Sequence, residues 1–144
     1  MMKIKGRLLK FDQVILNDHI FSKDCKINIP DKVPVVWDFD LDEVNKVYGM
    51  AHVERNKDGL IFTADIVDGA SDIVKAVQNE CGIGGYYGNV RYHKLCIGEQ
   101  YGHHEYRIVD EASLKAVSIT PAPVNKDYDY EIIYEENLHT GGNK

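Results

Sequence analysis

Two stretches near the middle of the chain alternate apolar and polar residues. Residues 46–54 and 60–66 each place apolar side chains at every second position. A period of two is typical of strands with one buried face. The intervening residues 56–59 (Asn-Lys-Asp-Gly) contain an Asp-Gly step, which readily adopts the positive φ of a tight turn. The pattern therefore predicts a β-hairpin.

Alternation or short apolar runs predict strands along most of the remaining chain. These strands cover residues 4–11, 33–37, 85–97, 104–109, 114–120 and 130–134. Apolar residues at three-and-four spacing follow the polar capping residues 68–72, which predicts an α-helix that ends near Cys81 and Gly82. Residues 110–114 are compatible with a second, shorter helix. Together these elements predict a β-rich α+β fold, a small closed or nearly closed antiparallel β-barrel with one or two helices packed on it.

The length and composition fit one globular domain. The chain has 144 residues, of which 44% are hydrophobic and 28% are charged, a balance typical of folded proteins. We predict a single domain over residues 1–136 and a polar C-terminal tail over residues 137–144. The apolar runs are short and the first residues lack an apolar signal-peptide core, so we expect neither a membrane partner nor secretion.

The charge balance argues against a nucleic-acid partner. The formal net charge is −6, whereas proteins that bind the phosphate backbone need a basic face. A cluster of aromatic and basic residues at positions 86–94 is therefore better interpreted as a surface for another protein.

Neither a metal site nor a cofactor site is predicted. The three cysteines form no C-x-x-C pair, and the histidines have no His-Glu-x-x-His spacing. Asp38, Asp40 and Asp42 stand at alternate positions and would share one face if this segment were extended. A cation site is conceivable there, but the glycine and the terminal glutamate of an EF-hand loop are missing. A solvated acidic loop is the better interpretation.

The glycine-rich segment 82–88 allows two interpretations. Its backbone N–H groups suit an oxyanion-type turn, whereas the structural alternative is a helix stop followed by a bend into the next strand. Cys81 stands beside this segment at the C-terminal end of the predicted helix, where the helix dipole raises the pKa of a thiol. A nucleophilic role for Cys81 is therefore disfavoured.

Several motifs occur in an order known from one protein family. Residues 33–40 (Val-Pro-Val-Val-Trp-Asp-Phe-Asp) are similar to a strand ending in Trp-acid-His-Asp, and residues 47–60 are similar to a glycine-containing hairpin with an acid-Gly-Leu turn. After the helix and the glycine-rich segment, residues 114–123 are similar to a closing strand with the pattern Leu-x-x-Val-Ser-Leu/Ile-x-x-x-Pro. In this order the chain resembles the prohead (capsid maturation) proteases of tailed bacteriophages over residues 3–134. Their fold is similar to that of the herpesvirus assembly protease.

Both catalytic positions of that family differ in this chain. The family places its catalytic histidine where this sequence has Phe39, and its nucleophilic serine in the segment where this sequence has Gly82 and Gly84. No serine occurs between residues 72 and 110. Losing a member of a catalytic triad typically lowers the rate by about 10⁴–10⁶-fold, so we assign no catalytic residue. A pair of Cys81 with His52 or His93 remains an alternative without a positive signature.

The resemblance therefore implies a protein that has kept the protease fold and lost its chemistry. We expect a phage virion component, such as a decoration or auxiliary head protein, made in the bacterial host cytoplasm and present in many copies or as an oligomer. Its partners would be capsid or other virion proteins. The alternative is an active prohead endopeptidase that cleaves scaffold or capsid segments during head assembly. The candidate interface residues are aromatic or acidic: Tyr86, Tyr87, Tyr92, Asp127, Tyr128, Asp129 and Tyr130.

Overall fold

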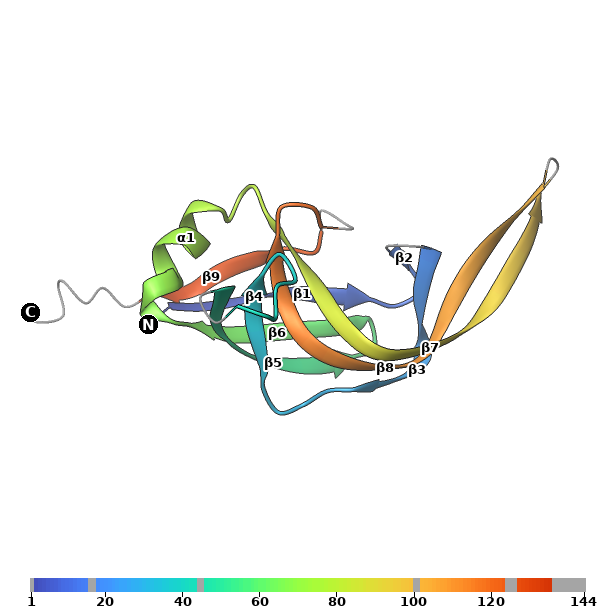
Figure 1. The fold of residues 1–144 in the computed structure, drawn as a ribbon, viewed down its shortest axis with the longest axis horizontal. Helices are drawn as coiled ribbons and strands as arrows, with labels where there is room; N and C mark the ends of the chain where they lie inside the picture. The colour runs from blue at the N-terminus through green and yellow to red at the C-terminus, as the bar shows by residue number, and fades with distance from the viewer. Residues whose placement is uncertain (1, 16–17, 44–45, 100–101, 124–126, 136–144) are drawn as a thin grey trace, which may run out of the picture.

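The computed structural model describes residues 2–15, 18–43, 46–99, 102–123 and 127–135. Over these residues, nine strands form one sheet with a single short α-helix beside it (Figure 1). The elements in chain order are β1 (Met2–Lys10), β2 (Val14–Ile15), β3 (His19–Asn28), β4 (Val33–Trp37), β5 (Val47–Asn56), β6 (Gly59–Ile66), the 3₁₀ helix η3 (Asp68–Ala70), α1 (Ser71–Ala76), β7 (Gly82–Glu99), β8 (Gly102–Thr120) and β9 (Tyr130–Glu135). The predicted β-rich α+β class is confirmed.

The long strand β8 organises the sheet. One edge of β8 pairs antiparallel with β7 along its whole length. The other edge pairs parallel with β3 and, further along, parallel with β4. From β4 the sheet continues antiparallel through β5, β6 and β1 to β9. β8 therefore joins the two halves of the sheet.

The sheet is not closed into a barrel. Within the described chain, β9 pairs only with β1 and β2 pairs only with β3, so the strand order has free ends. The predicted closed barrel is not confirmed, and an all-antiparallel sheet is wrong because β3 and β4 run parallel to β8. One backbone hydrogen bond, from the N–H of Ile83 to the carbonyl oxygen of Tyr128 at 2.6 Å, joins β7 to the segment before β9.

The hairpin predicted at residues 46–66 is confirmed by strands β5 and β6. The side-chain oxygen of Asn56 accepts the N–H groups of Asp58 and Gly59 at 2.9 and 3.0 Å, which closes the turn. Gly59 has a φ of 151°, and a Cβ there would collide with the carbonyl oxygen of Leu9. Both facts require glycine at this position.

One of the two predicted helices is present but shorter than expected, and the other is absent from the described residues. α1 begins at Ser71 as expected but ends at Ala76, and Gly82 pairs with Thr120 inside the sheet instead of ending the helix. The second helix, near residues 110–114, is wrong, because these residues belong to β8. Ala112 and Leu114 are buried while residues 111 and 115 are exposed, which is the alternation of a strand with one buried face.

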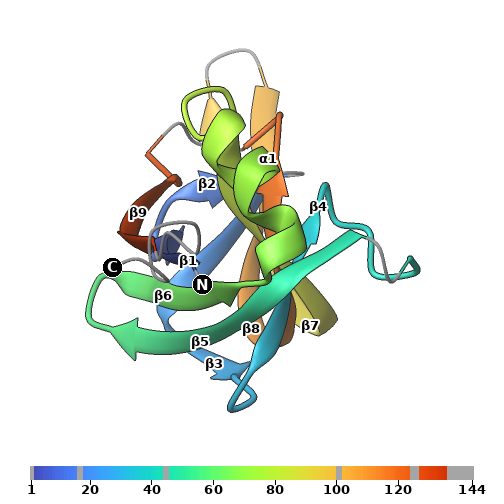
Figure 2. The same ribbon diagram turned by 90° about the vertical axis from the view of Figure 1, so that its left-hand side faces the viewer.

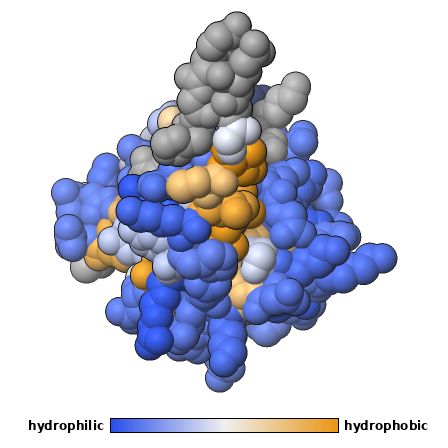
Figure 3. Space-filling view, turned by 90° about the vertical axis from the view of Figure 1, so that its right-hand side faces the viewer, coloured by the Kyte–Doolittle hydropathy of each residue, from blue (hydrophilic) through white to orange (hydrophobic). Residues whose placement is uncertain are grey.

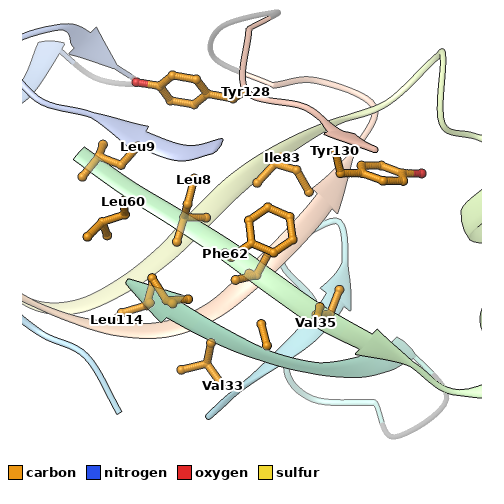
Figure 4. Packing of buried hydrophobic residues seen from close by; sticks show 14 of the residues in the cluster. Leu8, Leu9, Val33, Val35, Leu60, Phe62, Ile83, Leu114, Tyr128 and Tyr130 are labelled. Atoms are coloured by element: carbon orange, nitrogen blue, oxygen red, sulfur yellow. The ribbon is translucent and has the colours of Figure 1, made fainter. Parts of the chain in front are cut away.

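Every strand except β2 contributes fully buried side chains to one core, and Ile15 of β2 is partly buried and packs against it. Figure 4 shows Leu8, Leu60, Phe62 and Leu114 packed together inside the curved sheet. α1 lies at one end of this sheet, beside β9 in Figure 1 and in front of the strands in Figure 2. The single-domain prediction is compatible with this core and stays a prediction, while the predicted tail over residues 137–144 lies outside the described residues.

No helix among the described residues is long and apolar enough to cross a membrane.

Candidate functional site

The two positions that the family would use for catalysis are in contact. A Cβ added to Gly84 on β7 would lie 2.7 Å from Cζ of Phe39, so the tip of the aromatic ring lies against the glycine. At Gly82, the other candidate position, an added Cβ would instead meet Pro123 and the carbonyl oxygen of Tyr128. Of the two glycines, Gly84 is therefore the one that faces the segment after β4.

The turn that carries Phe39 is held against β8. Asp38 and Phe39 both have positive φ, 48° and 63°, so the chain turns sharply where β4 ends. The N–H of Asp38 donates to the carbonyl oxygen of Ile119 at 2.8 Å, and the N–H of Phe39 donates to Oγ of Ser118 at 2.8 Å. The hydroxyl of Thr120 donates to Oδ1 of Asp38 at 2.9 Å. These three bonds fix the ring of Phe39 over Gly84.

The hydroxyl and thiol groups near this contact are poor nucleophiles. Ser118 is the strand partner of Gly84, but it is fully buried and its oxygen already accepts the N–H of Phe39. Burial raises the pKa of the Cys81 thiol, and the nearby carboxylates of Glu80 and Asp38 raise it further. A thiolate is the reactive form of cysteine, so the structure disfavours attack by Cys81.

The histidines proposed as partners of Cys81 have other partners. Nε2 of His52 lies 3.3 Å from Oε1 of Glu54 on the same strand. Nδ1 of His93 lies 2.9 Å from the carboxylate of Asp110. Among the described residues neither histidine contacts the thiol, so the structure does not assemble a Cys-His pair.

The three alternating aspartates do not form one face. β4 ends at Trp37, and the positive φ at Asp38 bends the chain before Asp40. The carboxylate of Asp40 accepts the N–H groups of Asp42 and Glu43, at 2.9 and 3.3 Å, and so caps its own loop. Within the described ranges, no group of three or more His, Cys, Asp or Glu side chains is placed to hold a metal ion.

An apolar cavity adjoins the Phe39–Gly84 contact. Its volume is about 300 Å³. Its walls come from β1, β3 and β7, from Phe39, from the chain after β8 and from Tyr128. No sequence pattern indicated it, because its lining residues come from segments far apart in the chain.

The structure separates the candidate interface residues into two groups. Tyr87, Tyr128 and Tyr130 point into the protein: Tyr87 packs on Phe21 with ring centroids 4.7 Å apart, and the other two are less than 5% exposed. Tyr128 and Tyr130 are core residues and Tyr87 is partly buried against the core, which corrects their place on a free surface. The remaining candidates are exposed: Tyr86, Tyr92, Asp127 and Asp129.

The sequence predicted only part of the long hairpin that β7 and β8 form at one end of the molecule. β7 and β8 continue toward one end of the molecule as an antiparallel hairpin, here called the hairpin arm and defined as residues 91–98 and 104–110 (Figure 1). At its base, residues 107–109 also pair with β3 and Val109 is buried in the core, so the two strands project alone over residues 95–98 and 104–106. All side chains at positions 91–98 are exposed. The strands 85–97 and 104–109 were predicted, but their projection from the body could not be read from the alternation, because both faces of the arm meet solvent.

Comparison with known proteins gave no match. No protein-family model, no curated protein and no solved structure matches this chain. The resemblance to prohead proteases therefore stays a prediction from the sequence motifs.

Proposed function

We propose that this chain is a catalytically inactive protein of the prohead-protease type that acts through protein–protein contacts. In this proposal it is a phage virion component, a decoration or auxiliary head protein, made in the host cytoplasm and assembled into the head in many copies. Its partners are capsid or other virion proteins, not nucleic acid or a membrane. The observation that carries the proposal is the hairpin arm.

The hairpin arm has an apolar face and a charged face. Residues directly opposite each other in an antiparallel pair share a face. On one face, Leu95 is opposite Tyr106, and Ile108 is opposite His93. On the other face, Lys94 is opposite Arg107, whose guanidinium lies 5.5 Å from the ring of Tyr92. On the apolar face, Leu95 and Ile97 are exposed, whereas Tyr106 and Ile108 nearer the body are half-buried.

This exposed apolar face supports a binding role. Leu95 and Ile97 are 45% and 48% exposed, and Figure 3 shows a strip of hydrophobic surface that starts below the tip of the arm and runs between hydrophilic side chains. A two-stranded ribbon is at best marginally stable in water, and contiguous apolar surface commonly marks a protein interface. A partner that covers this face would stabilise the arm.

The contact between Phe39 and Gly84 supports the inactive half of the proposal. The phenyl ring cannot accept a proton, and glycine has no nucleophile. The alternative function, an endopeptidase that cleaves scaffold or capsid segments, needs both groups. The close approach of positions 39 and 84 supports descent from such an enzyme and gives no support to present activity. The backbone hydrogen bond between Ile83 and Tyr128, which links β7 to the segment before β9, similarly supports a nearly closed barrel arrangement.

Sedimentation with assembled heads tests the proposal. We expect the wild-type chain to co-sediment with phage heads and the double variant Leu95→Glu/Ile97→Glu to remain at the top of the gradient, because two carboxylates would have to lose their water in the interface. The matched control is Met50→Glu/Ile73→Glu, which places two charges on exposed apolar positions of the body and should co-sediment like the wild type.

Two results would contradict the proposal. Equal co-sedimentation of both double variants would show that the hairpin arm is not the contact surface. Failure of the wild-type chain to sediment with any head-sized particle would overturn the assignment to the virion.

A further inference from the structure

The outer edge of β7 is open along the hairpin arm. Over residues 92–98, β7 pairs with β8 alone within the described chain. The register shifts of this pair end between Arg91 and Tyr92, so no bulge interrupts the ladder from Tyr92 to Glu99, and no proline stands there. Natural sheets commonly block an exposed edge with a bulge, a proline or a covering segment. The regular edge of β7 is therefore a surface on which another strand can pair.

The end of the hairpin fixes which backbone groups face this edge. Glu99 pairs with Gly102, and these two residues must bond each other directly, because the alternative pattern would require the two neighbouring residues between them to bond each other. Hydrogen-bonded and non-hydrogen-bonded pairs alternate along an antiparallel ladder. Residues 93, 95 and 97 therefore bond to β8, while the N–H and C=O groups of Lys94, Cys96 and Gly98 face outward. An extended strand is the partner whose backbone matches such a row.

The side chains of this edge suit a second copy of the same strand that runs antiparallel to it. With Cys96 on the two-fold axis, the outward-facing backbone groups of one copy meet those of the other. Leu95 then lies opposite Ile97 of the second copy, and these side chains, 45% and 48% exposed in the single chain, contact each other. Lys94 lies opposite Gly98, which has no side chain to oppose it. The same short segment thus supplies both halves of a self-complementary contact.

The two neighbouring registers fit less well. An axis at Lys94 would set the ammonium groups of the two copies directly opposite each other, and like charges in that position are destabilising. An axis at Leu95 would place Ile97 opposite the imidazole of His93 and bring the two lysines to diagonal positions. The register centred on Cys96 keeps the lysines apart and pairs apolar side chains with each other.

We propose that the hairpin arms of two copies of this chain pair edge to edge, antiparallel, through residues 94–98 of β7 with Cys96 on the two-fold axis. The pairs made by Lys94, Cys96 and Gly98 exchange about six backbone hydrogen bonds, two for each pair. Because only one edge of each arm is covered, the contact is smaller than the ~1,200 Å² of a standard interface, and the dimer dissociates on dilution. The inference goes beyond the proposed head contact, which uses the apolar face of the arm rather than its edge.

Sedimentation equilibrium over a concentration series tests the pairing with a variant that blocks only the edge. The N–H of Cys96 faces away from β8, so Cys96→Pro removes an edge donor and spares the β7–β8 ladder, as proline does on other edge strands. We expect the wild-type chain to shift from monomer toward dimer as its concentration rises to roughly 1 mM, the range of weak complexes. Cys96→Pro should stay monomeric. The matched control is Cys96→Ser, which keeps the N–H and should dimerise like the wild type.

Cross-linking tests the register. Cys96 is a free, exposed thiol, and the central pair places the two Cα atoms about 5.5 Å apart. Bismaleimidoethane should therefore join two wild-type chains, and Cys96→Ser should remove this product. In Tyr92→Cys/Cys96→Ser each thiol stands four residues from the axis, which separates the two thiols by roughly 27 Å at ~3.4 Å per residue. This variant should not be joined by the short reagent.

Amide hydrogen exchange shows which backbone groups take part. The N–H groups of Lys94, Cys96 and Gly98 should exchange more slowly at high protein concentration than at low concentration. The N–H groups of Leu95 and Ile97, which bond to β8, should exchange at the same rate at both concentrations. Such alternation distinguishes pairing along the edge from packing of the apolar faces, which would leave the exchange of the outward N–H groups unchanged.

Three results would overturn the proposal. The first is a wild-type chain that stays monomeric up to roughly 1 mM. The second is dimerisation that survives Cys96→Pro, which would place the contact on another surface, such as the apolar face of the arm. The third is cross-linking of Tyr92→Cys/Cys96→Ser as strong as that of the wild type, which would show a different arrangement of the two strands.

Discussion

The phenyl ring of Phe39 lies on the backbone of Gly84, so close that a Cβ on the glycine would be 2.7 Å from Cζ of the ring. The same two positions are tied through the sheet, because Ser118 pairs with Gly84 and accepts the N–H of Phe39. Positions 39 and 84 are therefore coupled, because any side chain at position 84 would require the ring at position 39 to move.

Restoring a serine at position 84 should destabilise the protein. We expect Gly84→Ser to lower the free energy of unfolding by about 1–3 kcal/mol, the usual cost of forcing extra atoms into a packed site. In a Phe39→Ala background the same change should cost less than half as much, because the obstructing ring is gone. Urea denaturation of the four proteins in this cycle measures the coupling.

The matched control for this cycle is Gly69→Ser. A Cβ on Gly69 has no atom within 4 Å, so this change should cost less than about 0.5 kcal/mol. Equal costs of Gly84→Ser in the two backgrounds would show that Phe39 does not obstruct position 84.

Replacing Phe39 by histidine should not produce a protease. A histidine there can accept a proton, but Gly84 offers no oxygen, and the raised pKa of Cys81 keeps its thiol protonated. Casein hydrolysis by Phe39→His should stay at the level of buffer alone. Intact-mass spectrometry should likewise find no fluorophosphonate adduct on the wild-type chain; stoichiometric labelling of a serine would mean that the site has been misplaced.

The hydroxyl of Tyr130 should fasten α1 to the sheet. It donates to the carbonyl oxygen of Val74 at 2.6 Å in the buried interior. Tyr130→Phe should lower the free energy of unfolding by about 1–2 kcal/mol and increase amide hydrogen exchange in α1. Tyr134→Phe, on an exposed residue of β9, should leave both quantities unchanged. Unaltered exchange in α1 of the Tyr130→Phe variant would refute this role.

The fold should lose stability in alkaline solution. Burial raises the pKa of Tyr130 and of Tyr128 above the ordinary tyrosine value, which is about 10. The unfolded chain then releases these protons at a lower pH than the native chain does. The stability contributed by the neutral hydroxyls is therefore complete below about pH 10 and is lost as the pH rises from there toward the native pKa values.

Melting temperatures measured from pH 8 to pH 12 check this sign. They should fall above about pH 10, and Tyr130→Phe should make the fall shallower, because one shifted group is gone. A melting temperature that rises over this interval would contradict the direction.

The sequence was most informative where one pattern of apolar and polar residues, such as the alternation of a strand, continued over several residues. β4 spans residues 33–37 and the β5–β6 turn lies at residues 56–59, as predicted, because local alternation and an Asn/Asp-Gly turn decide both. The helix expected at residues 110–114 was wrong because so short a mixture of apolar and polar residues fits both the helical and the strand period. Only the buried Ala112 and Leu114, on the inner face of β8, show that a strand continues there.

The site depended on contacts between distant segments. The acidic character of residues 127–131 suggested a surface tail, yet Tyr128 and Tyr130 are buried between exposed aspartates, an alternation that the sequence already contained. The cavity brings together residues from position 8 to position 128. Such a combination of segments follows from the topology of the sheet and from no local pattern.

Quantitative mass spectrometry of purified mature phage particles tests the central claim most directly, because a structural protein stays in the particle whereas a maturation protease is normally lost from it. We predict the intact chain in a fixed ratio to the major head protein, unchanged between precursor and mature particles. Its absence from mature particles, together with new N-termini on head proteins that form only when this chain is made, would contradict the account.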